Sequence, residues 1–335
     1  MGIRMQRVRR DLHKTTSFIL LSLLFVLSCG PSTEDSPAER RFLSVGTAPP
    51  GGTFFILGGA IAQVVSQNRG DLTWEVSAEA TKGTQENIRR LASGELDFAL
   101  ANAAISYFAV RGEGAWGSKQ GIQTVMTMAP NVALFITQKS SGIKSLQGLK
   151  GKRVVVGVAG AGFEYFIRPI LAAHDITYDD FTPLYNTQTG TVDMLADGSA
   201  AAAFLGGAIP TASITQVSAS QSIFFIPFGE AEKDNLFKSY PFFGPATIPA
   251  DTYRGQTETF SGMNVGNMQL ITAAALDEET VYNFTKILYE KRAEVVKIHP
   301  AGRAINPKNI VKDTGTTFHP GAIRFYKEIG IWPES

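Results

Sequence analysis

Three short segments place glycine and hydroxyl residues directly before a stretch with helical periodicity. They run from Gly46 to Phe55, from Thr81 to Asn87 and from Gly157 to Glu164. The first turn of a helix leaves backbone N–H groups without intrahelical partners and carries a partial positive charge. Glycine lets a ligand approach such a turn closely, and a threonine hydroxyl adds a hydrogen-bond donor. This chemistry favours an anion.

Eight residues in these segments are candidate ligand contacts: Thr47, Gly52, Thr53, Phe54, Thr81, Thr84, Gly162 and Phe163. Thr53 and Thr84 also fit a simpler interpretation as helix N-caps. The third segment has the spacing G-x-x-G-x-G, which differs from the dinucleotide fingerprint G-x-G-x-x-G, and no P-loop G-K-[ST] occurs in the chain. We therefore expect no nucleotide cofactor.

Four further polar residues follow expected strand ends: Asn102, Tyr107, Asn186 and Gln188. Ligand sites in open α/β sheets lie beyond the carboxyl ends of the strands, so these side chains are candidate contacts. Asn102 also fits a turn residue, and Tyr107 also fits a core aromatic residue.

The elements that must position these residues alternate between short apolar, β-branched runs and amphipathic stretches, which predicts an α/β fold. The segment 125–138 is long for one strand and contains Pro130 and Asn131, so we expect the chain to cross there between two lobes. Residues 265–276 could carry the chain back to the first of these lobes. We expect one lobe from residues 42–128 plus 256–335 and another from 129–255, joined by a hinge with a ligand cleft between them.

The N-terminus has the three parts of an export signal: basic residues up to Lys14, an apolar run from Phe18 to Leu27, and the only cysteine, Cys29. The residues Val26 to Cys29 are similar to a bacterial lipobox, so we expect residues 1–29 to be a lipoprotein signal peptide. Lipidated Cys29 would then anchor the protein to a membrane in the periplasm through a flexible tether, residues 30–41. A plain secretory signal with an incidental cysteine is the alternative.

Little in the chain suggests catalysis. Neither H-E-x-x-H nor G-x-S-x-G occurs, and His299 and His319 each precede proline, a turn or capping context. The formal net charge of +1 is not that of a nucleic-acid-binding surface. We expect a monomeric protein that is not an enzyme, with no metal, no cofactor and no nucleic-acid partner; a secreted hydrolase has no support.

An ordered series of motifs resembles the TAXI family of solute receptors of TRAP transporters. It includes G-T-x-x-P-G-G-T-F-F from Gly46, T-x-G-[ST]-x-E-N from Thr81, L-A-S-G-E-x-D from Leu91, Y-P-F-F from Tyr240 and H-P-G-A-I-R-F-Y-K-E-I-G from His319. The resemblance implies a type II periplasmic-binding-protein fold. It also implies delivery of a small organic anion, a carboxylate such as an amino acid or dicarboxylate, to a membrane permease driven by an ion gradient.

Three positions depart from the family pattern. Ala161 and Phe163 replace hydroxyl residues of the family's second-lobe loop, and Ala104 stands where an acid is common. These changes remove polar groups from the expected cleft, so a ligand with an apolar portion fits this sequence. A periplasmic adaptor that presents its bound state to a sensor kinase is the alternative to uptake.

Overall fold

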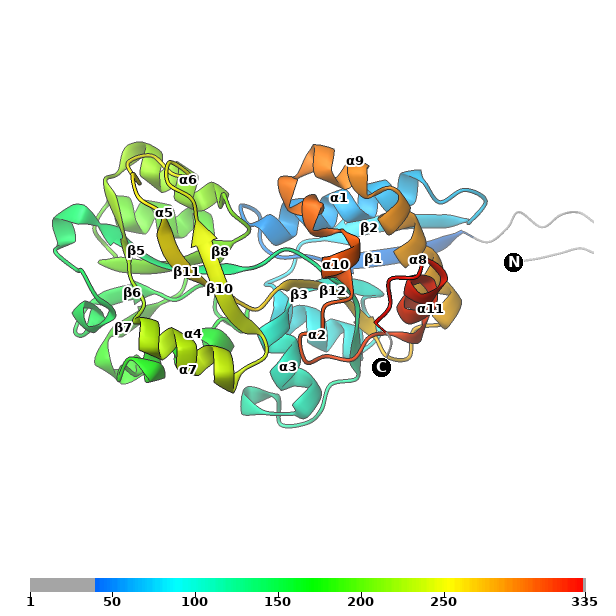
Figure 1. Ribbon diagram of the computed structural model, residues 1–335, viewed down its shortest axis with the longest axis horizontal. Coiled ribbons are helices and arrows are strands. Elements are labelled where there is room, and N and C mark those ends of the chain that lie inside the picture. Colours follow the sequence, from blue (N-terminus) through cyan, green and yellow to red (C-terminus); the bar gives the residue numbers. More distant parts are fainter. Residues whose placement is uncertain (1–39, 334–335) are drawn as a thin grey trace, which may run out of the picture. The chain divides into compact units, whose positions relative to one another are not determined.

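The computed structural model describes residues 40–333 of the 335-residue chain. Two β-sheets, each flanked by helices, form two lobes (Figure 1). We call the lobe with the five-stranded sheet the first lobe and the lobe with the seven-stranded sheet the second lobe. Within the described residues, no helix combines the length and apolar character that a membrane span requires.

The sheet of the first lobe has the strand order β2-β1-β3-β12-β4. Strand β1 is parallel to β2 and β3, whereas β12 is antiparallel to both β3 and β4. Strands in a sheet covered by helices on both faces are buried, as all five residues of β3 are. The strand bounds are Arg41–Gly46 (β1), Trp74–Glu79 (β2), Phe98–Asn102 (β3), Ile122–Thr127 (β4) and Met268–Ala273 (β12).

The helices of the first lobe bury one face each. In the longest of them, α1, residues at helical spacing such as Leu57, Ile61 and Val65 are buried. Helix α1 packs against β2 and against α8 and α9, and α8 packs against α11. The helix bounds are Thr53–Gln67 (α1), Thr84–Ala92 (α2), Ala103–Arg111 (α3), Glu278–Glu290 (α8), Arg292–Ile298 (α9), Pro307–Ile310 (α10) and Pro320–Glu328 (α11).

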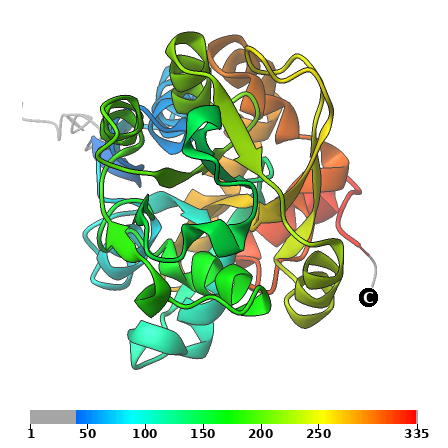
Figure 2. The same cartoon turned by 90° about the vertical axis from the view of Figure 1, so that its left-hand side faces the viewer.

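The sheet of the second lobe, which Figure 2 turns toward the viewer, has the order β10-β11-β5-β8-β6-β7, with β9 paired to β5. Its strands are Val132–Gln138 (β5), Arg153–Val155 (β6), Thr182–Leu184 (β7), Ala202–Gly207 (β8), Ile223–Ile226 (β9), Phe243–Ile248 (β10) and Phe260–Val265 (β11). Its helices are Glu164–Ala173 (α4), Gln188–Ala196 (α5), Ala212–Ser220 (α6) and Glu230–Ser239 (α7).

The chain passes between the sheets twice, through residues 128–131 after β4 and residues 266–267 before β12. The two passages lie side by side, because the Met268 N–H donates to the Ala129 carbonyl at 2.8 Å. A second bond, from the Val265 N–H to the Asn131 carbonyl, measures 2.9 Å. Two paired extended segments are therefore the covalent connection between the lobes.

The position of β11 differs from the sequence expectation, which gave residues 256–335 to the first lobe. Strand β11 pairs with β5 and β10 in the second sheet, so the return to the first sheet falls after Val265. The strand was missed because Ser261, Gly262 and Asn264 interrupt its apolar pattern.

A buried polar contact holds the two passages together. The Asn267 side chain, 2% exposed, donates to the Met128 carbonyl at 2.8 Å and accepts from the Asn264 amide at 2.9 Å. The Asn264 side chain in turn accepts from the Asn131 N–H at 3.0 Å. Two side chains of the returning segment thus bond to backbone groups of the first passage and fix the register of the connection.

Replacing Asn267 should destabilise the protein. Asn267→Ala leaves the buried Asn264 amide without an acceptor, which costs about 1–3 kcal/mol. We expect the free energy of unfolding in urea to fall by that amount, whereas Asn235→Ala, at an exposed position of α7, should change it little. A loss for Asn267→Ala no larger than for Asn235→Ala would contradict this role.

Candidate ligand-binding site

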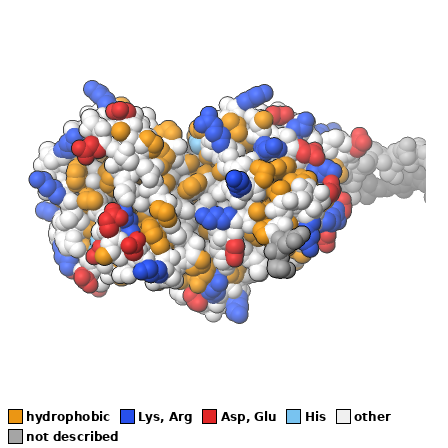
Figure 3. Space-filling view, viewed as in Figure 1, with side chains coloured by type: hydrophobic (Ala, Val, Ile, Leu, Met, Phe, Trp, Pro, Cys, Tyr) orange, Lys and Arg blue, Asp and Glu red, His pale blue; other side chains and the backbone are white. Residues whose placement is uncertain are grey.

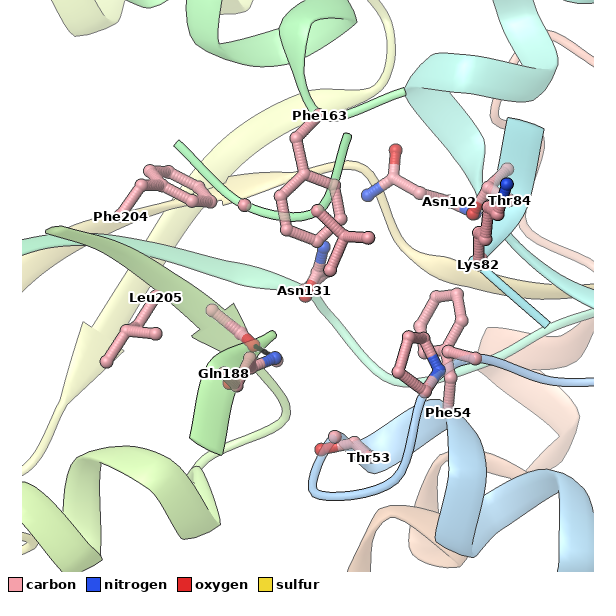
Figure 4. Close-up of a pocket in the computed structure, with 18 of the residues that line it drawn as sticks. Thr53, Phe54, Lys82, Thr84, Asn102, Asn131, Phe163, Gln188, Phe204 and Leu205 are labelled. Carbon is pink, nitrogen blue, oxygen red and sulfur yellow. Dashed lines mark hydrogen bonds between the residues drawn. The ribbon is translucent and has the colours of Figure 1, made fainter. Parts of the chain in front are cut away.

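A cavity lies where the loops of the two lobes face each other (Figure 4). The first lobe contributes the loop before α1, the starts of α1 and α2, and the end of β3. The second lobe contributes the loop after β6, the starts of α4 and α5, and the end of β8. Asn131, from the passage between the sheets, also lines it. The free volume of the cavity is about 70 Å³.

The start of α1 presents an uncapped helix end to this cavity. Its N-cap residue is Gly52, and no side chain caps the first turn. Thr53, the first helical residue, is 7% exposed and lines the cavity. Its hydroxyl makes no hydrogen bond within residues 40–333. A methyl group added at Gly207 of β8 would lie 3.1 Å from this hydroxyl, so Thr53 faces the second lobe.

The start of α2 has the same arrangement. Its N-cap is Gly83, whose φ of 115° favours glycine, and again no side chain caps the turn. The Thr84 hydroxyl accepts a hydrogen bond from the Asn102 N–H at 3.0 Å, so its own proton is free to point to a ligand. The N-cap interpretation of Thr53 and Thr84 was therefore wrong, because glycine holds both cap positions.

Three buried side chains hold these turns in place. The Thr81 hydroxyl donates to the Thr47 carbonyl at 3.0 Å and accepts from the Gly83 N–H at 3.1 Å. The Thr47 hydroxyl donates to the Glu79 carbonyl at 2.7 Å, and the Asn87 amide donates to the Thr47 and Leu100 carbonyls at 2.8 Å each. Thr47 and Thr81 thus support the site without lining the cavity.

Eight of the twelve predicted contacts line the cavity: Gly52, Thr53, Phe54, Thr84, Asn102, Phe163, Asn186 and Gln188. The other four, Thr47, Thr81, Tyr107 and Gly162, do not. Tyr107 packs on Phe242 and under the guanidinium of Arg111, and Gly162 packs against Ile105. The lipidation site expected at Cys29 lies outside the described residues.

Several lining amides are committed to the protein. The Asn102 side chain accepts from the Ala104 N–H at 2.8 Å and donates to the Gly266 carbonyl at 3.2 Å. Gln188 donates to the Gly206 carbonyl at 2.9 Å (Figure 4). It also accepts from the Ser213 hydroxyl at 2.6 Å. These residues shape the cavity and leave little free hydrogen-bonding capacity. The Asn131 amide, by contrast, makes no side-chain hydrogen bond in the described chain.

Lys82 and the end of β8 also line the cavity, although the sequence did not predict them as ligand contacts. Lys82 is the one charged side chain that lines the cavity among the residues described, and its ammonium makes no ion pair there. Lys82 lies inside the motif that begins at Thr81, so the motif itself could have indicated this residue as a ligand contact. Phe204 and Leu205 lie at the end of a predicted strand, but they read as core residues because both are buried apolar side chains.

The lobes also touch beside the cavity. The Gln85 N–H of α2 donates to the Ala161 carbonyl of the second lobe at 3.2 Å. The Ala115 N–H donates to the Tyr165 hydroxyl at 3.1 Å, and the Trp116 ring stacks on Tyr165 with centroids 6.0 Å apart. These contacts join the two lobes on that side of the cavity.

None of the histidines in residues 40–333 lines the cavity. His299 and His319 each accept a hydrogen bond from a backbone N–H at the start of a helix, so the capping interpretation is confirmed. Burial lowers the pKa of both imidazoles. Over residues 40–333, no three His, Cys, Asp or Glu side chains gather as a metal site would require.

Two solved structures share this architecture. The binding-protein component of an ABC phosphonate transporter from Pseudomonas aeruginosa is 12% identical, with 78% of this chain and 79% of that chain covered and a TM-score of 0.55. A protein from Bordetella bronchiseptica RB50 is 13% identical, with 88% and 90% covered and a TM-score of 0.52. The protein therefore has the two-lobed α/β fold of the periplasmic-binding-protein type, which confirms the expected fold class.

A protein-family match also spans most of the chain. The model of the NMT1-like family matches residues 45–330, from β1 to the end of α11. The chain belongs to the NMT1-like family. The matched range contains every residue that lines the cavity.

Thr53→Val tests whether the free hydroxyl of α1 serves a ligand. The change keeps the side-chain shape and removes a hydroxyl that has no described protein partner, so the melting temperature of the ligand-free protein should stay within about 2 °C. Affinity for a bound organic anion should fall about tenfold, as expected for one hydrogen bond to a charged group. Isothermal titration calorimetry measures the affinity; an unchanged value would remove Thr53 from the site.

Proposed function

We propose that the protein captures a small organic anion, a carboxylate, between its two lobes outside the cytoplasm and delivers it to a membrane permease of the TRAP type. The single observation that carries this proposal is the pair of uncapped helix starts that face one cavity beside an unpaired lysine, Lys82. Such a cavity attracts negative charge through backbone N–H groups and an ammonium.

The site supports binding rather than turnover. The lining residues include threonines, amides, glycines and aromatic rings, and Lys82 is their one titratable group in the described structure. General acid–base catalysis needs a positioned proton carrier, and nucleophilic catalysis needs an activated partner. The cavity therefore offers a ligand a place to bind and no reactive pair.

The two-lobed fold supports delivery to a membrane partner. Closure of lobes around a ligand changes the surface that both lobes present together, so a permease can distinguish the loaded protein from the empty one. On the face in Figure 3, acidic and basic side chains are interspersed over both lobes, without a single-sign patch. The TRAP-type permease follows from the motif series and not from this surface.

A thermal-shift screen tests the ligand class. Ligands that bind only the folded state raise the melting temperature by mass action, by an amount worth about 2.7 kcal/mol at a hundredfold excess over Kd. We expect small carboxylates to raise the melting temperature of the purified protein and neutral sugars to leave it unchanged. Stabilisation by sugars or peptides alone would refute the anion proposal.

The lipid anchor is tested separately. If Cys29 carries the lipid, Cys29→Ala should move the exported protein from the membrane fraction to the soluble periplasmic fraction. Ser28→Ala, which keeps a small residue beside the cysteine, serves as the control and should leave the protein on the membrane. Membrane retention of Cys29→Ala would contradict the anchor without affecting the binding proposal.

A further inference from the structure

We propose, on the basis of the function above, that the ligand is a monocarboxylate with a compact apolar body and no amino group. Its carboxylate lies against the first lobe, and its body lies against the second lobe. The inference rests on the distribution of charge, free hydrogen-bonding groups and aromatic rings around the cavity.

The charge of the lining is matched to one negative charge. Lys82 is the one cation, and no Asp or Glu lines the cavity within residues 40–333. An amino acid would bring an ammonium group that finds no carboxylate there, and a dicarboxylate would bring a second charge that finds no second cation. Burial of an unpaired charge is strongly unfavourable. A single carboxylate satisfies the site.

The free hydroxyl and ammonium donors of the lining lie on the first lobe. Thr53 is only 7% exposed, and its hydroxyl makes no hydrogen bond in the described chain. The Thr84 hydroxyl proton is free, and both helix starts lack side-chain caps. Lys82 is exposed at the edge of the cavity, so its flexible side chain reaches a carboxylate without burial of its own charge.

The apolar wall lies on the second lobe. Phe163, Phe166 and Phe204 form one ring cluster, with the centroids of Phe204 and Phe166 5.6 Å apart and those of Phe204 and Phe163 6.2 Å apart. Leu205 extends this wall. Figure 4 shows Phe204 and Leu205 on the opposite side of the cavity from Lys82 and Thr84. A ligand that spans the cavity therefore has a charged end and an apolar end.

The size of the cavity limits the body. Its free volume of about 70 Å³ is well below the roughly 300–1,000 Å³ of pockets that hold drug-sized ligands, so the body of the ligand is compact. Nucleotides and peptides are far larger.

A matched ligand series tests the inference by calorimetry on the purified protein. 3-Methylbutanoate carries one carboxylate and a branched apolar body; L-valine adds an ammonium, 3-methylbutanamide removes the charge, and succinate replaces the methyl groups with a second carboxylate. We expect 3-methylbutanoate to bind at least tenfold more tightly than each of the other three. From acetate to 3-methylbutanoate, affinity should rise by up to about fourfold per buried carbon.

A substitution of Lys82 is the second test of this inference. Lys82→Gln should weaken 3-methylbutanoate binding about tenfold and leave the amide unaffected, whereas Lys144→Gln, at an exposed position of the second lobe, should leave both unaffected. Equal effects of the two substitutions would overturn the assignment of Lys82. Tighter binding of valine or succinate would overturn the monocarboxylate class while anion capture itself stands. Failure of every anion would overturn both proposals.

Discussion

The organisation of this protein depends on two helix starts that are held in a shared cavity without caps. Backbone N–H groups at a helix start need an acceptor, and protein chains usually supply one from a Ser, Thr, Asp or Asn side chain at the N-cap. Here glycine occupies that position before α1 and α2. The buried network of Thr47, Thr81 and Asn87 holds the turns in place without a side-chain cap on either first turn, and in α2 only the Gln85 N–H already has an acceptor from the other lobe, the Ala161 carbonyl.

The second lobe adds selectivity to the positively polarised helix starts of the first lobe. It closes the cavity with aromatic rings, and the amide of Gln188 is already bonded to the backbone and to Ser213. Polar attraction thus comes mainly from one lobe and apolar contact from the other. Because only two extended segments connect the lobes covalently, a ligand that contacts both lobes adds to the interactions that hold them together.

Local sequence patterns were sufficient to predict the fold class and part of the site. The α/β alternation and the Gly-Thr turns are local signals, and they placed Thr53, Thr84 and Asn186 at the cavity. The sequence could not separate lining residues from supporting ones, because Thr47 and Thr81 have the same type and context as Thr53. Lys82 was missed since an exposed lysine has no distinctive pattern, and β11 was missed because polar residues and a glycine interrupt its apolar pattern.

Hydrogen–deuterium exchange with and without a saturating organic anion tests the central claim most directly. If the anion occupies the uncapped helix starts, amides at the beginnings of α1 and α2 should exchange more slowly in its presence, together with those at the end of β8 across the cavity. Slower exchange confined to one lobe, or elsewhere in the molecule with these amides unchanged, would contradict the account.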